Sequence, residues 1–204
     1  MARVQPKFDD FMSIITYLSH FHPIYSCADE LKRRLVRVNL PPRTAILRPG
    51  QVCNNLFFIE SGSLQASEVR EGKEYINWIL SGPAFAQSAR SFHTQSIGAE
   101  TIESVEDSVV TMLNSDDLYY MIHNYHDFSV CMFKLMTHIT VMREVKFALA
   151  MTPDAELRVL RLATLEPQLF ERVPLNALAS YLSMTPETLS RITHKKKFLQ
   201  LMGK

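Results

Sequence analysis

The sequence predicts an α+β protein in which a strand-rich region, one long helix and a small all-helical region follow one another. Residues 36 to about 114 contain short β-branched and aromatic runs separated by Gly and Pro turns. Residues 116 to about 150 change to an apolar pattern with heptad spacing, and residues 151–204 contain short helical patterns separated by breaks. We therefore expect three parts, at residues 1–115, 116–150 and 151–204.

The strand-rich region is marked by turn dipeptides. Pro49-Gly50 and Ser61-Gly62 enclose a run rich in apolar residues, QVCNNLFFIE, and Glu71-Gly72-Lys73 precedes a second run, EYINWIL. The stretch ETIESVEDSVVTML supplies further β-branched residues. Several short strands at close spacing, joined by Gly and Pro turns, are typical of an antiparallel sandwich or barrel.

The long helix is predicted by apolar residues spaced four and three positions apart, in a pattern interrupted by Lys146. The stripe consists of Phe128, Met132, Leu135, Ile139, Met142 and Leu149. An apolar stripe of this length needs a packing partner. The partner is either the chain's own barrel or a parallel helix from a second subunit. We favour the second interpretation, which makes the protein a homodimer.

Composition places the chain among ordinary globular proteins. Of its 204 residues, 47% are hydrophobic and 21% are charged, and the formal net charge is only +1. The three cysteines are far apart and form no CxxC pair, which indicates free thiols in a reducing compartment. The sequence contains no signal-peptide pattern and no apolar run near the ~20 residues that span a bilayer. We expect a cytoplasmic protein without a membrane partner.

The stretch LASYLSMTPETLSRITHKKKF predicts a helix-turn-helix. Ala179 is small enough to let two helices cross closely, and Ser183 stands in the turn, where Gly is usual. Thr185 is well placed as a helix N-cap, with Pro186 as the first helical residue. From Pro186 onward five basic residues face one acidic residue, a local net charge of +4. This asymmetry is typical of nucleic-acid-binding segments.

The outward face of the second helix carries the candidate DNA contacts. Glu187 and Arg191 share one face, because they are four residues apart. Arginine can hydrogen-bond guanine bidentately, and glutamate can accept from the amino group of cytosine. Hydroxyl and lysine side chains are suited to contacts with DNA phosphates. Thr193 and Lys197 are two residues of this kind. The predicted contacts to double-stranded DNA are Thr185, Glu187, Thr188, Ser190, Arg191, His194, Lys195 and Lys196. The alternative is a solvated helix face with a Glu187–Arg191 salt bridge.

Three segments resemble the cyclic-AMP receptor protein/fumarate-nitrate regulator (Crp/Fnr) transcription factors. RVPLNALASYLSMTPETLSRI is similar to the helix-turn-helix of the branch common in Bacteroidetes-type bacteria, RPGQVCNNLFFIESGSL to a β-roll segment, and ETIESVEDSVV to the strand after the ligand loop. The resemblance implies a dimer with an N-terminal cyclic-nucleotide-binding β-roll (jelly-roll), a long dimerisation helix and a C-terminal helix-turn-helix domain. It makes RNA polymerase a candidate partner. It also implies that Glu187 and Arg191 contact bases, while Pro186 replaces an often basic residue and the β-hairpin wing is expected to be missing.

The ligand loop departs from the family pattern. In relatives that bind cyclic nucleotides, a Glu binds the ribose and an Arg pairs with the cyclic phosphate; here the resemblance places Gln87 and Gly98 at those positions. A charge-assisted phosphate contact is hard to replace, so we expect that cyclic AMP (cAMP) is not the effector. A pocket for another small molecule would be lined by Gln87, Ser88, Arg90 and Ser91. The alternative is a filled barrel that serves only as a scaffold.

Other functional classes find little support. His123, His126 and Asp127 are close in sequence but lack the pattern of a metal site, so no metal is predicted. The sequence has no nucleophile elbow, P-loop or dinucleotide fingerprint, and we expect neither an enzyme nor a cofactor. The competing hypothesis is a ligand-binding or protein-interaction module whose helical domain does not bind DNA.

Overall fold

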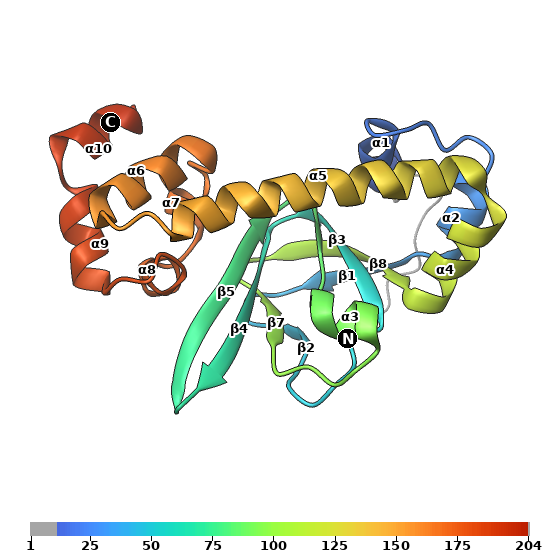
Figure 1. Ribbon diagram of the computed structural model, residues 1–204, viewed down its shortest axis with the longest axis horizontal. Coiled ribbons are helices and arrows are strands. Elements are labelled where there is room, and N and C mark those ends of the chain that lie inside the picture. The colour runs from blue at the N-terminus through green and yellow to red at the C-terminus, as the bar shows by residue number, and fades with distance from the viewer. Residues whose placement is uncertain (1–11, 204) are drawn as a thin grey trace.

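The computed structural model describes residues 12–203 and confirms the α+β prediction, with an antiparallel β-roll followed by helices (Figure 1). The strands are β1 (Val36–Leu40), β2 (Ala45–Leu47), β3 (Asn55–Ser61), β4 (Ser63–Arg70), β5 (Lys73–Ser81), β6 (Ala84–Ala86), β7 (Thr101–Ser104) and β8 (Ser108–Asn114). They form two four-stranded sheets with the orders β1-β8-β3-β6 and β2-β7-β4-β5. All strand pairs are antiparallel.

The predicted turns lie between strands as expected. Glu71 and Gly72 form the two-residue loop of the β4–β5 hairpin, and both have positive φ, 52° and 75°. Positive φ at both central residues matches the right-handed twist of the flanking strands. Gly62 also has a positive φ, 88°, and a Cβ there would lie 2.6 Å from the Cα of Ser108. No larger residue fits at this position without displacing β8.

The core of the β-roll centres on β3. Four consecutive residues, Leu56 to Ile59, are buried. A strand buried on both faces shows a continuous apolar run instead of alternation. Phe58 lies 5.3 Å from the ring of Tyr17 and 5.0 Å from the ring of Phe85, so an N-terminal helix covers this sheet. The helices that flank the roll are α1 (Met12–Ser19), α2 (Ala28–Arg34), α3 (Ala89–Thr94), α4 (Ser115–Asn124) and α5 (His126–Ala150).

The region expected as one long helix is broken at Tyr125. Its backbone is extended, with φ −130° and ψ 107°, and it separates α4 from α5. The carboxylate of Asp127 accepts hydrogen bonds from the amide and the hydroxyl of Ser26, at 3.0 and 2.6 Å. These contacts anchor the first turn of α5 to the loop before α2. The helix then crosses the whole molecule to reach the C-terminal helices (Figure 1).

Most of the predicted dimer stripe is buried within the chain itself. Phe128, Met132 and Leu135 belong to the β-roll core, and Ile139 packs partly against it. Leu149 lies in a second core, and only Met142 is exposed, at 37%. The prediction that these six residues form a subunit seam was therefore wrong for the buried ones. Heptad spacing specifies one apolar face without specifying which surface covers it.

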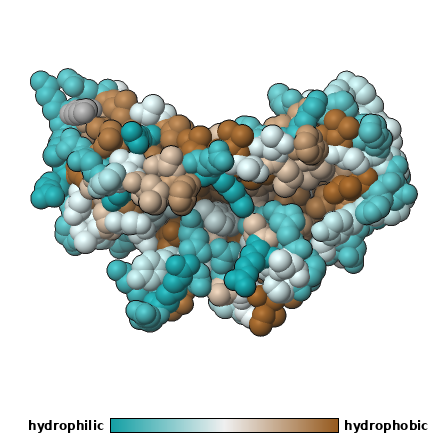
Figure 2. All heavy atoms as spheres, in the orientation of Figure 1, coloured by the Kyte–Doolittle hydropathy of each residue, from teal (hydrophilic) through white to brown (hydrophobic). Residues whose placement is uncertain are grey.

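The exposed surface of α5 also carries apolar side chains, of which Val141 and Val145 share one side of the helix. The large ones are Phe133, Val141, Met142, Val145 and Phe147. Hydrophobic patches lie along the upper edge of the molecule, where α5 runs (Figure 2). Val141 is 53% exposed and Phe147 is 68% exposed. Apolar residues gathered on one surface mark an interaction site more often than scattered ones do.

The C-terminal helices form their own core and pack on the β-roll. They are α6 (Ala155–Leu165), α7 (Leu169–Arg172), α8 (Leu175–Tyr181), α9 (Pro186–Thr193) and α10 (Lys196–Leu201). Ile76 and Ile79 of β5 belong to the same buried cluster as Val159, Leu178 and Leu189. The long β4–β5 hairpin therefore contributes to both halves of the molecule.

Candidate nucleic-acid interface

The turn between α8 and α9 has a defined hydrogen-bonded geometry. The amide of Met184 donates to the carbonyl of Ala179, and the amide of Ser183 donates to the carbonyl of Ser180, both at 3.0 Å. These two bonds form a Schellman motif, whose residue after the C-cap adopts the left-handed conformation. Ser183 occupies that position with φ 54°. Ser183 therefore adopts the left-handed conformation that glycine usually adopts at this turn.

The start of α9 is capped as the sequence predicts. The Oγ1 of Thr185 accepts a hydrogen bond from the amide of Thr188 at 3.2 Å, and Pro186 begins the helix. Leu189 and Ile192 are buried against Ala179, which is itself fully buried. The inner face of α9 is thus fixed, and its other face is directed away from the helical core.

The exposed face of α9 carries the two residues expected to contact bases. Glu187 and Arg191 are both exposed, and no ion pair joins them among the described residues. The pKa of the Glu187 carboxyl is lowered because its own backbone amide and the Thr185 side chain hydrogen-bond to it. Glu187 is therefore an ionised acceptor at neutral pH, and Arg191 lies one turn further along the same face.

The remaining predicted contacts differ in accessibility. Thr188 and Ser190 are half-buried, and the Nδ1 of His194 lies 2.7 Å from the carbonyl oxygen of Ser190. The Nζ of Lys195 forms an ion pair with Glu156 of α6, a partner that the sequence pattern did not reveal. Lys196 is exposed. The side chain of Lys197 and residue Lys204 lie outside the described part of the chain.

The position expected to hold a phosphate-binding arginine is closed by packing. The amide of Gly98 donates to the carbonyl of Gln51 at 3.0 Å, and its carbonyl accepts from Gly50 at 2.8 Å. A Cβ on Gly98 would lie 3.3 Å from the Cβ of Ser91, which is tight contact. A larger residue at position 98 would therefore have to displace Ser91.

Of the four predicted effector-pocket residues, Gln87 lines the cavity between α3, α4 and α5, and the other three do not line that cavity. Ser91 is buried, and its hydroxyl accepts from the Cys53 amide at 2.9 Å and donates to the Ser96 carbonyl at 2.6 Å. Ser88 is buried and donates to the carboxylate of Glu100, while Arg90 is exposed. Internal hydrogen bonds thus occupy the hydroxyls of Ser88 and Ser91, and a pocket lined by these residues stays a prediction.

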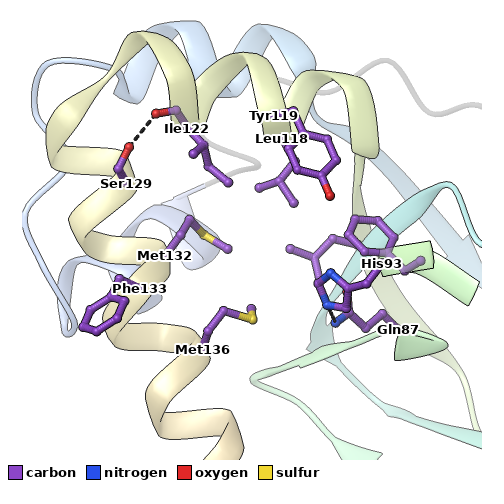
Figure 3. Close-up of a pocket in the computed structure, with 11 residues that line it drawn as sticks. Gln87, His93, Leu118, Tyr119, Ile122, Ser129, Met132, Phe133 and Met136 are labelled. Atoms are coloured by element: carbon purple, nitrogen blue, oxygen red, sulfur yellow. Dashed lines mark hydrogen bonds between the residues drawn. The ribbon is translucent and has the colours of Figure 1, made fainter. Parts of the chain in front are cut away.

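Gln87 lines a cavity of about 320 Å³ between α3, α4 and the first half of α5 (Figure 3). Apolar residues from α4 and α5 form most of its wall, including Leu118, Ile122 and Met136. The sequence pattern missed them, because apolar residues at helical spacing look the same in a core and in a cavity wall.

The described residues form neither a cluster of metal ligands nor a membrane-spanning helix. Between residues 12 and 203, no three His, Cys, Asp or Glu side chains lie close enough together to hold a metal ion. The carboxylate of Asp127 is bound to Ser26, and the ring of His123 hydrogen-bonds the carbonyl of Tyr119. The three cysteines are free and buried. No helix in the described range is long and apolar enough to cross a membrane.

Comparison with known proteins supports the β-roll assignment. Residues 37–125 match the family model described as a cyclic nucleotide-binding domain, which extends through α4 to the helix break at Tyr125. No curated protein matches the sequence.

Several solved structures share the overall fold. The c-di-GMP responsive global regulator CLP of Xanthomonas campestris superposes with a TM-score of 0.64 at 17% identity, covering 88% of this chain and 93% of its own. FixK2 from Bradyrhizobium japonicum gives 0.65 at 13% identity, covering 83% and 86%. A transcriptional regulator of the Crp/Fnr family from Eubacterium rectale gives 0.65 at 16% identity, covering 90% and 89%. Residues 37–125 are therefore similar to a cyclic nucleotide-binding domain, and the chain shares the fold of these three solved structures.

Proposed function

We propose that the chain is a cytoplasmic DNA-binding transcription regulator of the Crp/Fnr type, and not an enzyme. The observation that carries the proposal is the exposed pair Glu187 and Arg191, one turn apart on a helix whose opposite face is buried. Such a helix can enter a major groove, where arginine pairs with guanine and glutamate accepts from cytosine. The preceding Schellman turn and the Thr185 cap hold the helix at a fixed angle to α8.

The active form in this proposal is a homodimer. Two copies of α9 would contact successive major grooves about 34 Å apart and recognise a near-palindromic site. The exposed side of α5 that carries Val141 and Val145, one turn apart, replaces the buried stripe as the proposed dimer surface. The parts of each subunit are residues 1–115, 116–150 and 151–204, and RNA polymerase is a further candidate partner.

The effector in this proposal is not cAMP. Gly98 presents no cationic side chain, and its neighbours Ser88 and Ser91 leave little space for one. An effector that shifts α5 would re-aim both α9 helices, because α5 runs directly into the helical domain.

Selection of DNA fragments from a random pool tests the proposal. The full chain is incubated with the pool at moderate salt, with and without cAMP, and bound fragments are sequenced. We expect a two-fold-symmetric site that is enriched equally in both conditions. A site that is enriched only with cAMP would contradict the effector assignment. No enrichment in either condition would favour the protein-interaction module.

Arg191→Ala then tests the contact itself. It should cost about 1–3 kcal/mol on the selected site and relax the preference at one base pair. Arg33→Ala is the matched control, because Arg33 is an exposed arginine on α2 that is paired with Glu30. An equal loss for Arg191→Ala on every sequence would assign Arg191 to a phosphate instead.

A further inference from the structure

The cavity beside Gln87 has the size and the chemistry of a small-molecule site. Its volume of about 320 Å³ is at the lower end of the range of roughly 300–1,000 Å³ typical of ligand pockets. Three separate elements form its walls, with Phe92 from α3, Leu118 from α4 and Met136 from α5. Figure 3 shows Leu118, Met132 and Met136 directed toward a common space between the helices.

The α3 side of the cavity holds an incompletely bonded amide. The Nε2 of Gln87 lies 3.0 Å from the Nε2 of His93, so one end of the amide has a partner. The other end, Oε1, is buried and has no hydrogen-bond partner among the described residues. A buried polar atom without a partner is destabilising, because it has lost its hydration without gaining a hydrogen bond. A ligand that supplies a donor here would provide that hydrogen bond.

The other lining residues determine which kind of ring system the cavity can hold. The ring of Phe92 meets His93 edge-on, at a centroid distance of 5.3 Å, and Tyr119 stands at the same cavity. Met132 and Met136 add polarizable thioethers, which pack well on aromatic faces. No Asp, Glu, Lys or Arg lines the cavity, and the Nε2 of its histidine, His93, already lies against Gln87. A charged ligand would therefore lose its hydration without gaining a lysine, arginine or carboxylate partner.

We propose that this cavity binds a small, uncharged aromatic molecule that carries one hydroxyl group, which donates to the Oε1 of Gln87. The site is formed mainly by residues of α3, α4 and α5. It does not depend on Gly98, Ser88 or Ser91. Occupancy can be measured without DNA, so the proposal stands or falls separately from DNA binding.

Two probes with the same ring system test the proposal on the full chain. 2-Naphthol carries a hydroxyl donor, and 2-methoxynaphthalene carries only an acceptor. Calorimetry gives the affinity of each, and methyl NMR of ¹³C-methionine protein locates the probe. We expect one 2-naphthol per chain, with shifts of the Met132 and Met136 methyls and none at Met142, which lies outside the cavity on the same helix. The methoxy compound should bind about fivefold more weakly.

Three variants sharpen the result. Met136→Trp fills the cavity and should abolish binding, whereas Met142→Trp at an exposed position should leave it unchanged. Gln87→Met removes the acceptor and should equalise the two probes. The proposal is overturned if the Met132 and Met136 methyls do not move in the wild-type protein, or if both probes bind it equally. It is also overturned if Met136→Trp, folded by its NMR spectrum, still binds 2-naphthol.

Discussion

The hydroxyl oxygen of Ser180 on α8 accepts a hydrogen bond from the backbone amide of Ile76 on β5, at a distance of 3.2 Å. This bond joins the helical domain to the edge of the β4–β5 hairpin. An ion pair of 2.8 Å between Arg172 of α7 and Glu106, which precedes β8, also joins the two parts, and Ile79 is buried in the core of the helical domain. The position of α9 relative to the β-roll therefore depends on side chains of β5 as well as on α5.

Ser180→Ala should loosen this junction. The substitution removes the acceptor for the Ile76 amide, and we expect a loss of about 1 kcal/mol in the free energy of unfolding. Amide hydrogen exchange should become faster at Ile76, and urea denaturation should show the lower stability. Ser61→Ala, at an exposed position of β3, is the control. Unchanged exchange at Ile76 in Ser180→Ala would show that the bond contributes nothing in solution.

Ser183→Gly should stabilise the protein. Ser183 has φ 54°, a conformation that costs a residue with a side chain roughly 1 kcal/mol relative to glycine. The matched control is Ser190→Gly, because Ser190 lies within α9. Glycine in a helix interior should lower the free energy of unfolding by about 0.5–1 kcal/mol. The midpoint of chemical denaturation should therefore rise for one Ser→Gly change and fall for the other. Two shifts of the same sign would contradict the turn geometry.

Thr185→Ala should destabilise α9 even without DNA. The Thr185 hydroxyl caps the amide of Thr188, and loss of such a cap costs about 1 kcal/mol. Thr185→Ser keeps the oxygen and should preserve the stability. Thermal unfolding of both variants without DNA measures the difference. If Thr185→Ala and the wild-type protein melt at the same temperature, the Thr185 hydroxyl does not stabilise the free protein, and its role is restricted to contacts with DNA.

Val141→Glu and Val145→Glu should each dissociate the dimer. The two side chains lie one turn apart on α5 and are 53% and 37% exposed. Burial of an unpaired carboxylate at a subunit seam should raise the dimer dissociation constant at least about 100-fold. Sedimentation equilibrium measures this constant. Tyr25→Glu changes an exposed aromatic residue outside α5 and serves as the control. Dimers that withstand both α5 changes would place the interface elsewhere.

The stability should fall at alkaline pH through the buried thiols. Burial, followed by the nearby Asp127 charge, raises the pKa of Cys27 from 9.0 to about 12, and burial raises that of Cys131 to about 11. Below pH 9 both thiols are protonated in the folded and unfolded chains, so they do not change the stability with pH. Above pH 9 the unfolded chain releases protons that the folded chain retains, and the free energy of unfolding decreases as the pH rises.

Urea denaturation between about pH 8 and about pH 10.5 measures this effect. Cys27→Ala should show a smaller decrease over this range than the wild-type chain, whatever its stability at the lower pH. Parallel pH profiles for the two proteins would show that the Cys27 thiol does not titrate differently on unfolding.

Much of the architecture follows from local sequence patterns. The turns at Gly62 and Gly72, the cap at Thr185 and the start of α9 at Pro186 lie where adjacent residues predict them. These features depend on backbone conformations and hydrogen bonds within a few residues, so a short stretch of sequence is enough to specify them. The exposed pair Glu187 and Arg191 was predictable for the same reason, since helical spacing assigns both to one face.

Only the tertiary structure decided which residues the apolar and polar side chains contact. The heptad stripe that begins at Phe128 packs on the chain's own β-roll, and the hydroxyl of Ser91 is taken up by Cys53 and Ser96. Lys195 pairs with Glu156, which lies 39 residues away in sequence. A periodic pattern states that a face is buried, whereas the identity of its partner depends on how distant segments fold together. The sequence by itself therefore determined the elements and their faces, and the packing of α5, β5 and the helical domain determined which surfaces remain exposed.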